Sequence, residues 1–238
     1  MVTIEEFLEC YKRLENAVAV TFPRDKNKQR IVECLTENHI SGIDWPRLRK
    51  LRSIRNAFSH NSCMDGDIAG INDSANEFLR MVTESVLALP KVGNVCKPIK
   101  KVFFCGLDTL ISDVVAGMVK SVFSHVPVLD AQDKVIGVFS ESTMLEMHKS
   151  GWTHKDTAKI KSIRDLLPVN RHKADEFPFV SMSAPVSCLR RLTSEALAAG
   201  KRIGLFLVTE NGREDEPLTG ILTVWDIAGV SDSEIGNK

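Results

Sequence analysis

The sequence predicts an α+β protein of two domains, an N-terminal all-α helical bundle followed by an α/β domain. Three observations carry this prediction. Apolar residues recur at three- and four-residue steps from Met1 to Pro90, short β-type runs alternate with helical stretches after Asn94, and one such arrangement occurs twice. The chain has 238 residues, which is enough for two domains of ordinary size.

The composition is that of a folded protein in water. Apolar residues make up 43% of the chain and charged residues 26%, both close to the average for globular proteins. Lys and Arg together number 31, as do Asp and Glu, so no net field would hold the whole molecule on nucleic acid or on an anionic membrane. No basic segment followed by an apolar run begins the chain, and no later run is long enough to span a bilayer. A cytoplasmic protein is therefore expected.

The first two helices follow from local patterns. A helix is expected over Thr3 to Val20, because the apolar residues share one face and Thr3 stands three residues before Glu6, as in a capping box. A basic polar turn leads to a second helix, expected near Gln29 to Glu37.

Two further helices complete the expected bundle. The third begins at Trp45, since Pro46 suits a first helical turn. Ser74 and Glu77 have capping-box spacing and predict the start of the fourth, which ends before Pro90. The helical domain is predicted to span residues 1–92.

The second part of the chain contains an internal repeat of strand pairs. The runs Val126–Leu129 and Val135–Ser140 are matched by Leu205–Val208 and Leu218–Thr223, and each pair is flanked by helical stretches. The second copy carries extra residues, Arg213–Glu216, which are expected only to lengthen a solvated hairpin loop. A further β-type run, Val102–Phe104, is also expected to be a strand.

This repeat resembles a tandem pair of CBS domains, over residues 97–232. The copies correspond to about 97–150 and 177–230, and the connecting stretch Ile163–Leu167 is similar to the one common in such pairs. The resemblance implies that both copies pack into one α/β unit of the Bateman type.

The stretch Gly220–Asp226 is similar to the nucleotide-binding pattern of that family. The resemblance implies that Asp226 accepts hydrogen bonds from ribose hydroxyls, while Thr223 and the free amide hydrogens of a helix start face a phosphate. Ser183 is expected to line the same cleft. The implied regulatory ligand is an adenine nucleotide such as AMP or ATP, without a metal. The alternative is that Asp226 only caps a helix and Thr223 is an ordinary strand residue.

The first copy departs from this pattern. Ser140 keeps the hydroxyl, but Thr143 replaces the carboxylate that Asp226 supplies in the second copy. Whether the first copy binds a ligand is therefore open, as is the choice among AMP, ATP, S-adenosylmethionine and a signalling dinucleotide.

A basic run lies on the expected third helix. Five cations and no acid occur from Arg47 to Arg55. Helical spacing places Leu48 and Leu51 on the buried face and Arg52, Asn56 and His60 on another side. Contacts to RNA are expected from four of the cations: Arg47, Arg49, Lys50 and Arg52. The alternative interpretation is a solvated helix face.

Arg55, Asn56 and His60 fit the Arg-x4-His signature of HEPN domains, which are all-helical bundles found in many metal-independent ribonucleases. The resemblance implies attack of a ribose 2'-hydroxyl on the adjacent phosphate. His60 would move a proton, because the pKa of histidine lies near working pH. Arg55 would hold the phosphate, and Asn56 would orient the histidine or the phosphate. One such motif makes half a site, so a homodimer is part of this hypothesis.

The preferred interpretation is a nucleotide-regulated, metal-independent endoribonuclease, in which the CBS pair senses an adenine nucleotide. The alternative is a non-catalytic CBS nucleotide-sensing protein whose helical domain binds a protein partner. A structural assembly of stacked CBS pairs is a third interpretation.

No metal or disulfide is expected. The six cysteines show no C-x-x-C motif and no zinc-finger spacing, so free buried thiols are expected. His125 and the other histidines beyond it show no ligand spacing with one another, and no role is assigned to them.

Overall fold

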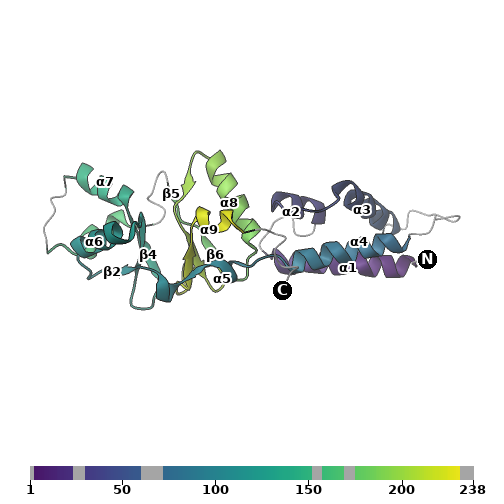
Figure 1. Cartoon of the computed structure of the whole chain (residues 1–238), viewed down its shortest axis with the longest axis horizontal. Coiled ribbons are helices and arrows are strands. Elements are labelled where there is room, and N and C mark those ends of the chain that lie inside the picture. Colours follow the sequence, from purple (N-terminus) through teal and green to yellow (C-terminus); the bar gives the residue numbers. More distant parts are fainter. Residues whose placement is uncertain (1–2, 24–29, 60–71, 152–156, 169–174, 231–238) are drawn as a thin grey trace. The chain divides into compact units, whose positions relative to one another are not determined.

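The structure of the chain is a computed structural model that describes residues 3–23, 30–59, 72–151, 157–168 and 175–230 (Figure 1). Contacts between residues divide it into two compact units. The first comprises the residues up to Pro90 together with Pro185–Arg191, and the second comprises Lys91–Ala184 and Leu192–Val230. Within the described ranges, no helix combines the length and the apolar character needed to cross a membrane.

The first unit contains the four helices that the sequence predicts: α1 (Ile4–Thr21), α2 (Ile31–Glu37), α3 (Trp45–Ser59) and α4 (Asp73–Leu87). The capping box at the start of α1 is confirmed. The Glu6 amide donates to Thr3 Oγ1 over 3.2 Å, and the Thr3 amide donates to Glu6 Oε2 over 2.8 Å. Two of the backbone N–H groups at this helix end are thereby satisfied.

The cap predicted for the fourth helix is wrong. Asn72, not Ser74, is the N-cap of α4, and its Oδ1 accepts from the Ala75 amide over 3.2 Å. Asparagine caps a helix as well as serine does, so the earlier residue takes this role. Ser74 lies inside α4, where its hydroxyl donates to the same Asn72 oxygen over 2.7 Å.

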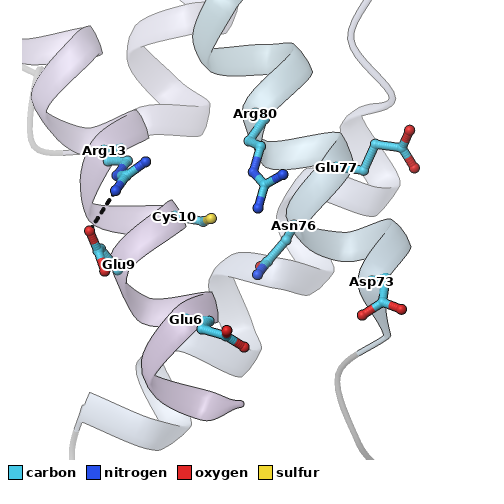
Figure 2. A pocket seen from close by; sticks show the side chains of 8 residues that line it. All are labelled: Glu6, Glu9, Cys10, Arg13, Asp73, Asn76, Glu77 and Arg80. Atoms are coloured by element: carbon cyan, nitrogen blue, oxygen red, sulfur yellow. Dashed lines mark hydrogen bonds and ion pairs between the residues drawn. The ribbon is translucent and has the colours of Figure 1, made fainter. Parts of the chain in front are cut away.

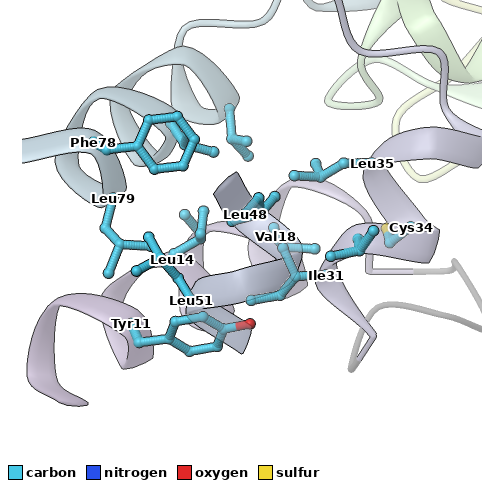
Figure 3. Packing of buried hydrophobic residues seen from close by; sticks show 14 of the residues in the cluster. Tyr11, Leu14, Val18, Ile31, Cys34, Leu35, Leu48, Leu51, Phe78 and Leu79 are labelled. Atoms are coloured by element: carbon cyan, nitrogen blue, oxygen red, sulfur yellow. The ribbon is translucent and has the colours of Figure 1, made fainter. Parts of the chain in front are cut away.

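All four helices contribute to one hydrophobic core (Figure 3). The side chains drawn there include Tyr11, Leu14, Val18, Ile31, Cys34, Leu35, Leu48, Leu51, Phe78 and Leu79. Because each helix is apolar on one stripe only, the helices are stable when these stripes are buried against one another.

The second unit alternates short strands and helices. Its helices are α5 (Val92–Val95), α6 (Ile111–Ser121), α7 (Glu141–Lys149), α8 (Val186–Ala198), which begins among residues grouped with the first unit, and α9 (Val224–Ala228). Two 3-10 turns are η1 (Ile99–Lys101) and η2 (Ile160–Leu166). The strands are β1 (Lys97–Pro98), β2 (Cys105–Gly106), β3 (His125–Leu129), β4 (Val135–Ser140), β5 (Asp175–Glu176), β6 (Phe179–Ser181), β7 (Arg202–Ile203), β8 (Phe206–Thr209) and β9 (Gly220–Leu222).

These strands form three sheets, ordered β1-β9-β8-β6, β2-β3-β4 and β5-β7. Both strand pairs of the predicted repeat form, as antiparallel β3–β4 and antiparallel β8–β9. The strand expected at Val102–Phe104 is absent, because that segment follows η1 outside any ladder. The Phe103 side chain packs against α6 instead: a Cβ on Gly117 of α6 would lie 2.3 Å from the Phe103 ring.

One glycine in each copy allows a backbone segment from outside the strand pair to lie against a strand. A Cβ on Gly137 would lie 2.1 Å from the Leu167 carbonyl oxygen, and one on Gly220 would lie 2.6 Å from that of Lys97. The first approach is accompanied by a hydrogen bond from the Val138 amide to the Leu167 carbonyl, over 3.0 Å. The second accompanies the pairing of β1 with β9.

The loop between β8 and β9 is not simply solvated, contrary to the prediction from the sequence. Glu216 is only 7% exposed. Its carboxylate accepts from the Asn211 amide and from Asn211 Nδ2, both over 2.8 Å. A buried carboxylate needs such donors, so the extra residues of the second copy form an ordered turn closed by Glu216.

We expect the Glu216 turn to make stability depend on pH. Hydrogen bonds from Asn211 lower the pKa of Glu216 from 4.5 to about 2. A carboxyl with a depressed pKa stabilises the fold above its ordinary pKa, and this contribution is lost as the pH falls toward 2. Glu216→Gln should therefore melt below wild type at neutral pH, and the gap should narrow as the pH is lowered through this window.

Circular-dichroism melts across that pH range test the prediction. The control is Glu214→Gln, which changes an exposed acid of the same loop. A gap between Glu216→Gln and wild type that does not change with pH would contradict the role assigned to the carboxylate.

Candidate functional site

The second unit contains a cavity of about 540 Å³ that is lined by residues from β1, β3, β7, β9 and α9, among others. Its apolar wall consists of Val102, Phe103, Val122, Phe123, Ile203, Leu205, Ile221, Val224 and Trp225. Its polar side chains are Lys97, Ser124, His125, Glu141, Arg202, Thr223 and Asp226. An apolar wall with a few polar groups is typical of a site for a small organic molecule.

Thr223 and Asp226, which the sequence singles out, both line this cavity. The Thr223 amide and hydroxyl each donate to Asp226 Oδ2 over 2.7 Å, and the Asp226 amide donates to Thr223 Oγ1 over 3.3 Å. The two residues therefore cap α9 reciprocally, which was the alternative interpretation of Asp226. Because these contacts use only Oδ2, Asp226 can cap the helix and still offer Oδ1 to a ligand.

Three side chains of the cavity can meet an anion: Lys97, His125 and Arg202. Lys97 Nζ lies 4.9 Å from the centre of the Phe123 ring, and the His125 ring lies edge-on to Phe177 at 5.5 Å. No sequence motif singled out these three residues. The internal repeat points only to His125, because His125 stands where the second copy has Gly204. A Cβ on Gly204 would lie 2.9 Å from His125 Nε2, so the glycine leaves room for the His125 ring.

Arg202 is held at the edge of the cavity by a buried carboxylate. Asp175 is 1% exposed and accepts hydrogen bonds from Arg202 Nε and, over 3.0 Å, from the Ser142 hydroxyl. Burial raises the pKa of Asp175, but the hydrogen bonds from Arg202 and Ser142 outweigh burial and hold the pKa below its ordinary value. Asp175 thus stays ionised and orients the guanidinium group.

Ser183 is not among the residues that line this cavity. Strand register explains why. β6 runs parallel to β8 with Ser181 opposite Thr209, whereas β9 runs antiparallel to β8 with Leu222 opposite Phe206. Residues that follow β6 and residues that follow β9 therefore lie at opposite ends of β8. The Ser183 hydroxyl lies 2.9 Å from that of Ser181.

The corresponding residues of the first copy are buried. Ser140 and Thr143 are each 1% exposed. The Thr143 amide donates to Ser140 Oγ over 3.2 Å, and the Ser140 amide donates to Thr143 Oγ1 over 3.1 Å. Thr143 thus performs the capping role of Asp226 without a carboxylate, and the pair caps the start of α7.

In the first unit, Arg55 already has partners. Its guanidinium group lies 2.7 Å from the Glu15 carboxylate and 5.8 Å from the centre of the Tyr11 ring. It also donates to Asn56 Oδ1 over 3.2 Å. His60 lies outside the described residues, so its position relative to Arg55 and Asn56 is a prediction from the sequence alone.

The cations expected to contact RNA divide into two groups. Arg47 donates to the Ser74 carbonyl over 2.7 Å and lies 4.6 Å from the centre of the Phe78 ring. Arg52 donates to both carboxylate oxygens of Glu33, over 2.7 and 2.9 Å. These two cations hold α3 to its neighbouring helices, whereas Arg49 and Lys50 are exposed.

Within the ranges that the structure covers, no three His, Cys, Asp or Glu side chains are grouped to hold a metal. The cysteines there are free, namely Cys10, Cys34, Cys96, Cys105 and Cys188, while Cys63 lies outside these ranges. Burial raises the pKa of Cys105 to about 12, so this residue is a protonated thiol.

Comparison with known proteins identifies part of the chain. The family model of the CBS domain matches residues 92–149, so the chain contains a CBS domain. No curated protein matches the sequence.

Several solved structures match the chain. One is CBSX2 in complex with AMP, which is 20% identical in sequence; the match covers 58% of this chain and 92% of that chain, with a TM-score of 0.43. A second is a putative acetoin utilization protein, AcuB from Vibrio cholerae, which is 17% identical; the match covers 59% of this chain and 88% of that chain, with a TM-score of 0.44. A third is the CBS domain pair of protein MJ0100 in complex with 5'-methylthioadenosine and S-adenosyl-L-methionine, which is 16% identical. The match covers 59% of this chain and 94% of that chain, with a TM-score of 0.42.

We expect Arg202→Met to destabilise the second unit. The change leaves Asp175 buried with one hydrogen-bond donor fewer, which costs about 1–3 kcal/mol for an unpaired buried group. Arg202→Lys should retain part of this stability because it keeps the charge. Chemical denaturation measures both variants, with Lys120→Met, an exposed cation of α6, as the matched control. If Arg202→Met unfolds at the same denaturant concentration as the control, the pair does not hold the fold.

Proposed function

We propose that the second unit is a pair of CBS repeats that binds an adenine nucleotide in the cavity beside α9, and that the protein is a nucleotide-sensing regulator. One observation carries this proposal: Thr223 and Asp226 line the same cavity as Lys97, His125 and Arg202. The cavity thus combines a carboxylate, two permanent cations and an apolar wall, which are the three kinds of group that a nucleotide needs.

Each part of a nucleotide has a chemically suited partner. The ribose hydroxyls donate to Asp226 Oδ1, whose neighbour Oδ2 is used by the helix cap. The phosphate meets the charged groups of Lys97 and Arg202, since charge-assisted hydrogen bonds to phosphate are strong. The adenine ring packs against the apolar wall, where Trp225, 87% exposed, offers an aromatic face.

A regulatory role requires more than binding. The nucleotide must bind two conformations of the protein with different affinity, because a ligand that binds both equally shifts no equilibrium. Arg202 supports such a difference. Its guanidinium group already serves the buried Asp175, so a phosphate that draws on the same group changes the contacts around β5 and β7.

We expect Asp226→Asn to weaken binding of the nucleotide by roughly tenfold or more, because it removes a charge-assisted hydrogen bond to ribose. Titration calorimetry with AMP, ATP, S-adenosylmethionine and a signalling dinucleotide gives the affinities. Asp215→Asn, an exposed acid outside the cavity, is the control. Absence of binding for all four compounds, or equal affinity of Asp226→Asn and wild type, would contradict the proposed site.

RNA cleavage by the first unit is the second candidate function. The observation that favours it is the hydrogen bond between Arg55 and Asn56 on α3. Arg55 is half-buried and Asn56 exposed, so both are accessible to a substrate. A bound phosphate would share Arg55 with Glu15, and His60 would act as the proton-transfer group. In this proposal a homodimer brings two such motifs together.

We expect wild type, but not His60→Ala, to cleave a mixed RNA pool in the presence of EDTA. The physical reason is that the attacking 2'-hydroxyl must lose a proton and the leaving oxygen must gain one, and without a metal the His60 residues of the two protomers are the groups suited to make these transfers near neutral pH. Gel analysis of RNA fragments measures cleavage, with and without whichever compound binds in the calorimetric titrations. Lys12→Ala, an exposed cation of α1, controls for loss of charge. Equal cleavage by His60→Ala, or none by wild type, would leave the helical unit as a docking module for a protein partner.

A further inference from the structure

A polar groove of about 610 Å³ lies between α1 and α4 of the first unit, on residues to which neither candidate function assigns a role (Figure 2). From α1 it is lined by Glu6, Glu9, Cys10 and Arg13. From α4 it is lined by Asp73, Asn76, Glu77 and Arg80. On each helix these residues follow one another at steps of one or three, so they form one stripe.

Asn76 is the unusual member of this groove. Its side chain is buried, with 4% of its surface exposed, and its Oδ1 has no hydrogen-bond partner among the described residues. A buried amide oxygen without a donor is costly, and folded proteins rarely leave one so. In Figure 2 the Asn76 carboxamide points into the space between the two helices. The groove therefore holds an acceptor that a bound molecule can satisfy.

Arg80 supplies the complementary donor. Arg13 is paired with Glu9 over 2.6 Å, but the structure gives Arg80 no hydrogen bond or ion pair with any described residue. Figure 2 shows its guanidinium group directed toward Asn76 and Cys10, with Glu77 turned away. A planar guanidinium group in this setting suits a carboxylate, which it can bind through two parallel hydrogen bonds.

The charges around the groove select the rest of the ligand. Glu6, Glu9, Asp73 and Glu77 supply four negative charges, against two positive charges from Arg13 and Arg80. A ligand with only a carboxylate would meet an excess of like charge, and a simple diamine would meet the Arg80 cation. A molecule with a carboxylate and two cationic groups fits both features.

We propose that this groove binds an amino acid with a cationic side chain, such as lysine or arginine. The ligand's carboxylate binds Arg80, and its α-ammonium group donates to Asn76 Oδ1. Its cationic side chain lies between the carboxylates of Glu6 and Asp73. The site is independent of the nucleotide cavity, because every residue that lines the groove belongs to the first unit.

Titration calorimetry on the full chain tests this proposal with matched probes. Lysine is compared with cadaverine, which lacks the carboxylate, and with norleucine, which lacks the side-chain ammonium group. We expect saturable binding of lysine or arginine, and binding of both analogues weaker by roughly tenfold or more, the loss of one charge-assisted contact.

Two variants identify the residues. Arg80→Met should weaken lysine binding by a similar factor, whereas Lys12→Met, an exposed cation of α1 outside the groove, should bind lysine as wild type does. Asn76→Leu should weaken binding while melting no lower than wild type, because it deletes a buried acceptor that has no partner.

Three results would overturn the proposal: no saturable binding of either basic amino acid at millimolar concentrations, cadaverine binding as tightly as lysine, or lysine binding that survives Arg80→Met. The last two results would indicate a general cation-binding surface. Nucleotide titrations of the same samples report on the other unit, so failure of one proposal is distinguishable from failure of the other.

Discussion

The close approach of two backbones at Gly220 is the constraint on which the candidate nucleotide site depends. A Cβ at this position would lie 2.6 Å from the Lys97 carbonyl oxygen, so glycine allows β1 to pair with β9. That pairing brings Lys97 to the cavity that Thr223 and Asp226 also line. Gly137 admits the backbone of Leu167 in the same way. In each copy a segment from outside the strand pair thus lies against the pair's second strand.

The same capping geometry serves different purposes in the two copies. In the first, Ser140 and Thr143 are buried and satisfy each other at the start of α7. In the second, Asp226 takes the place of Thr143, and a carboxylate has one oxygen more than the cap requires. A single change from hydroxyl to carboxylate at an exposed helix start is enough to turn a structural cap into a candidate ligand group.

Charge in the first unit serves mainly to join helices. Arg52 reaches Glu33 on α2, and Arg55 reaches Glu15 on α1. The acids that pair with Arg52 and Arg55 are distant in sequence. The basic run considered alone therefore predicts an open basic face. Among the described residues, two buried side-chain atoms have no hydrogen-bond partner, Asn76 Oδ1 and Ser187 Oγ, and the first of them belongs to the groove between α1 and α4.

The sequence by itself determined the features that depend on neighbouring residues. Helical periodicity, the Thr3–Glu6 box and the first-turn proline Pro46 predicted the helices, and the repeated apolar runs predicted the strand pairs β3–β4 and β8–β9. Thr223 and Asp226 were also recognisable, since their contact spans three residues. Tertiary structure alone decided that Lys97, His125 and Arg202 meet at one cavity, that Ser183 lies at the opposite end of β8, and that Glu216 is buried. Those outcomes follow from strand register and burial between residues far apart in the chain, for which no local pattern exists.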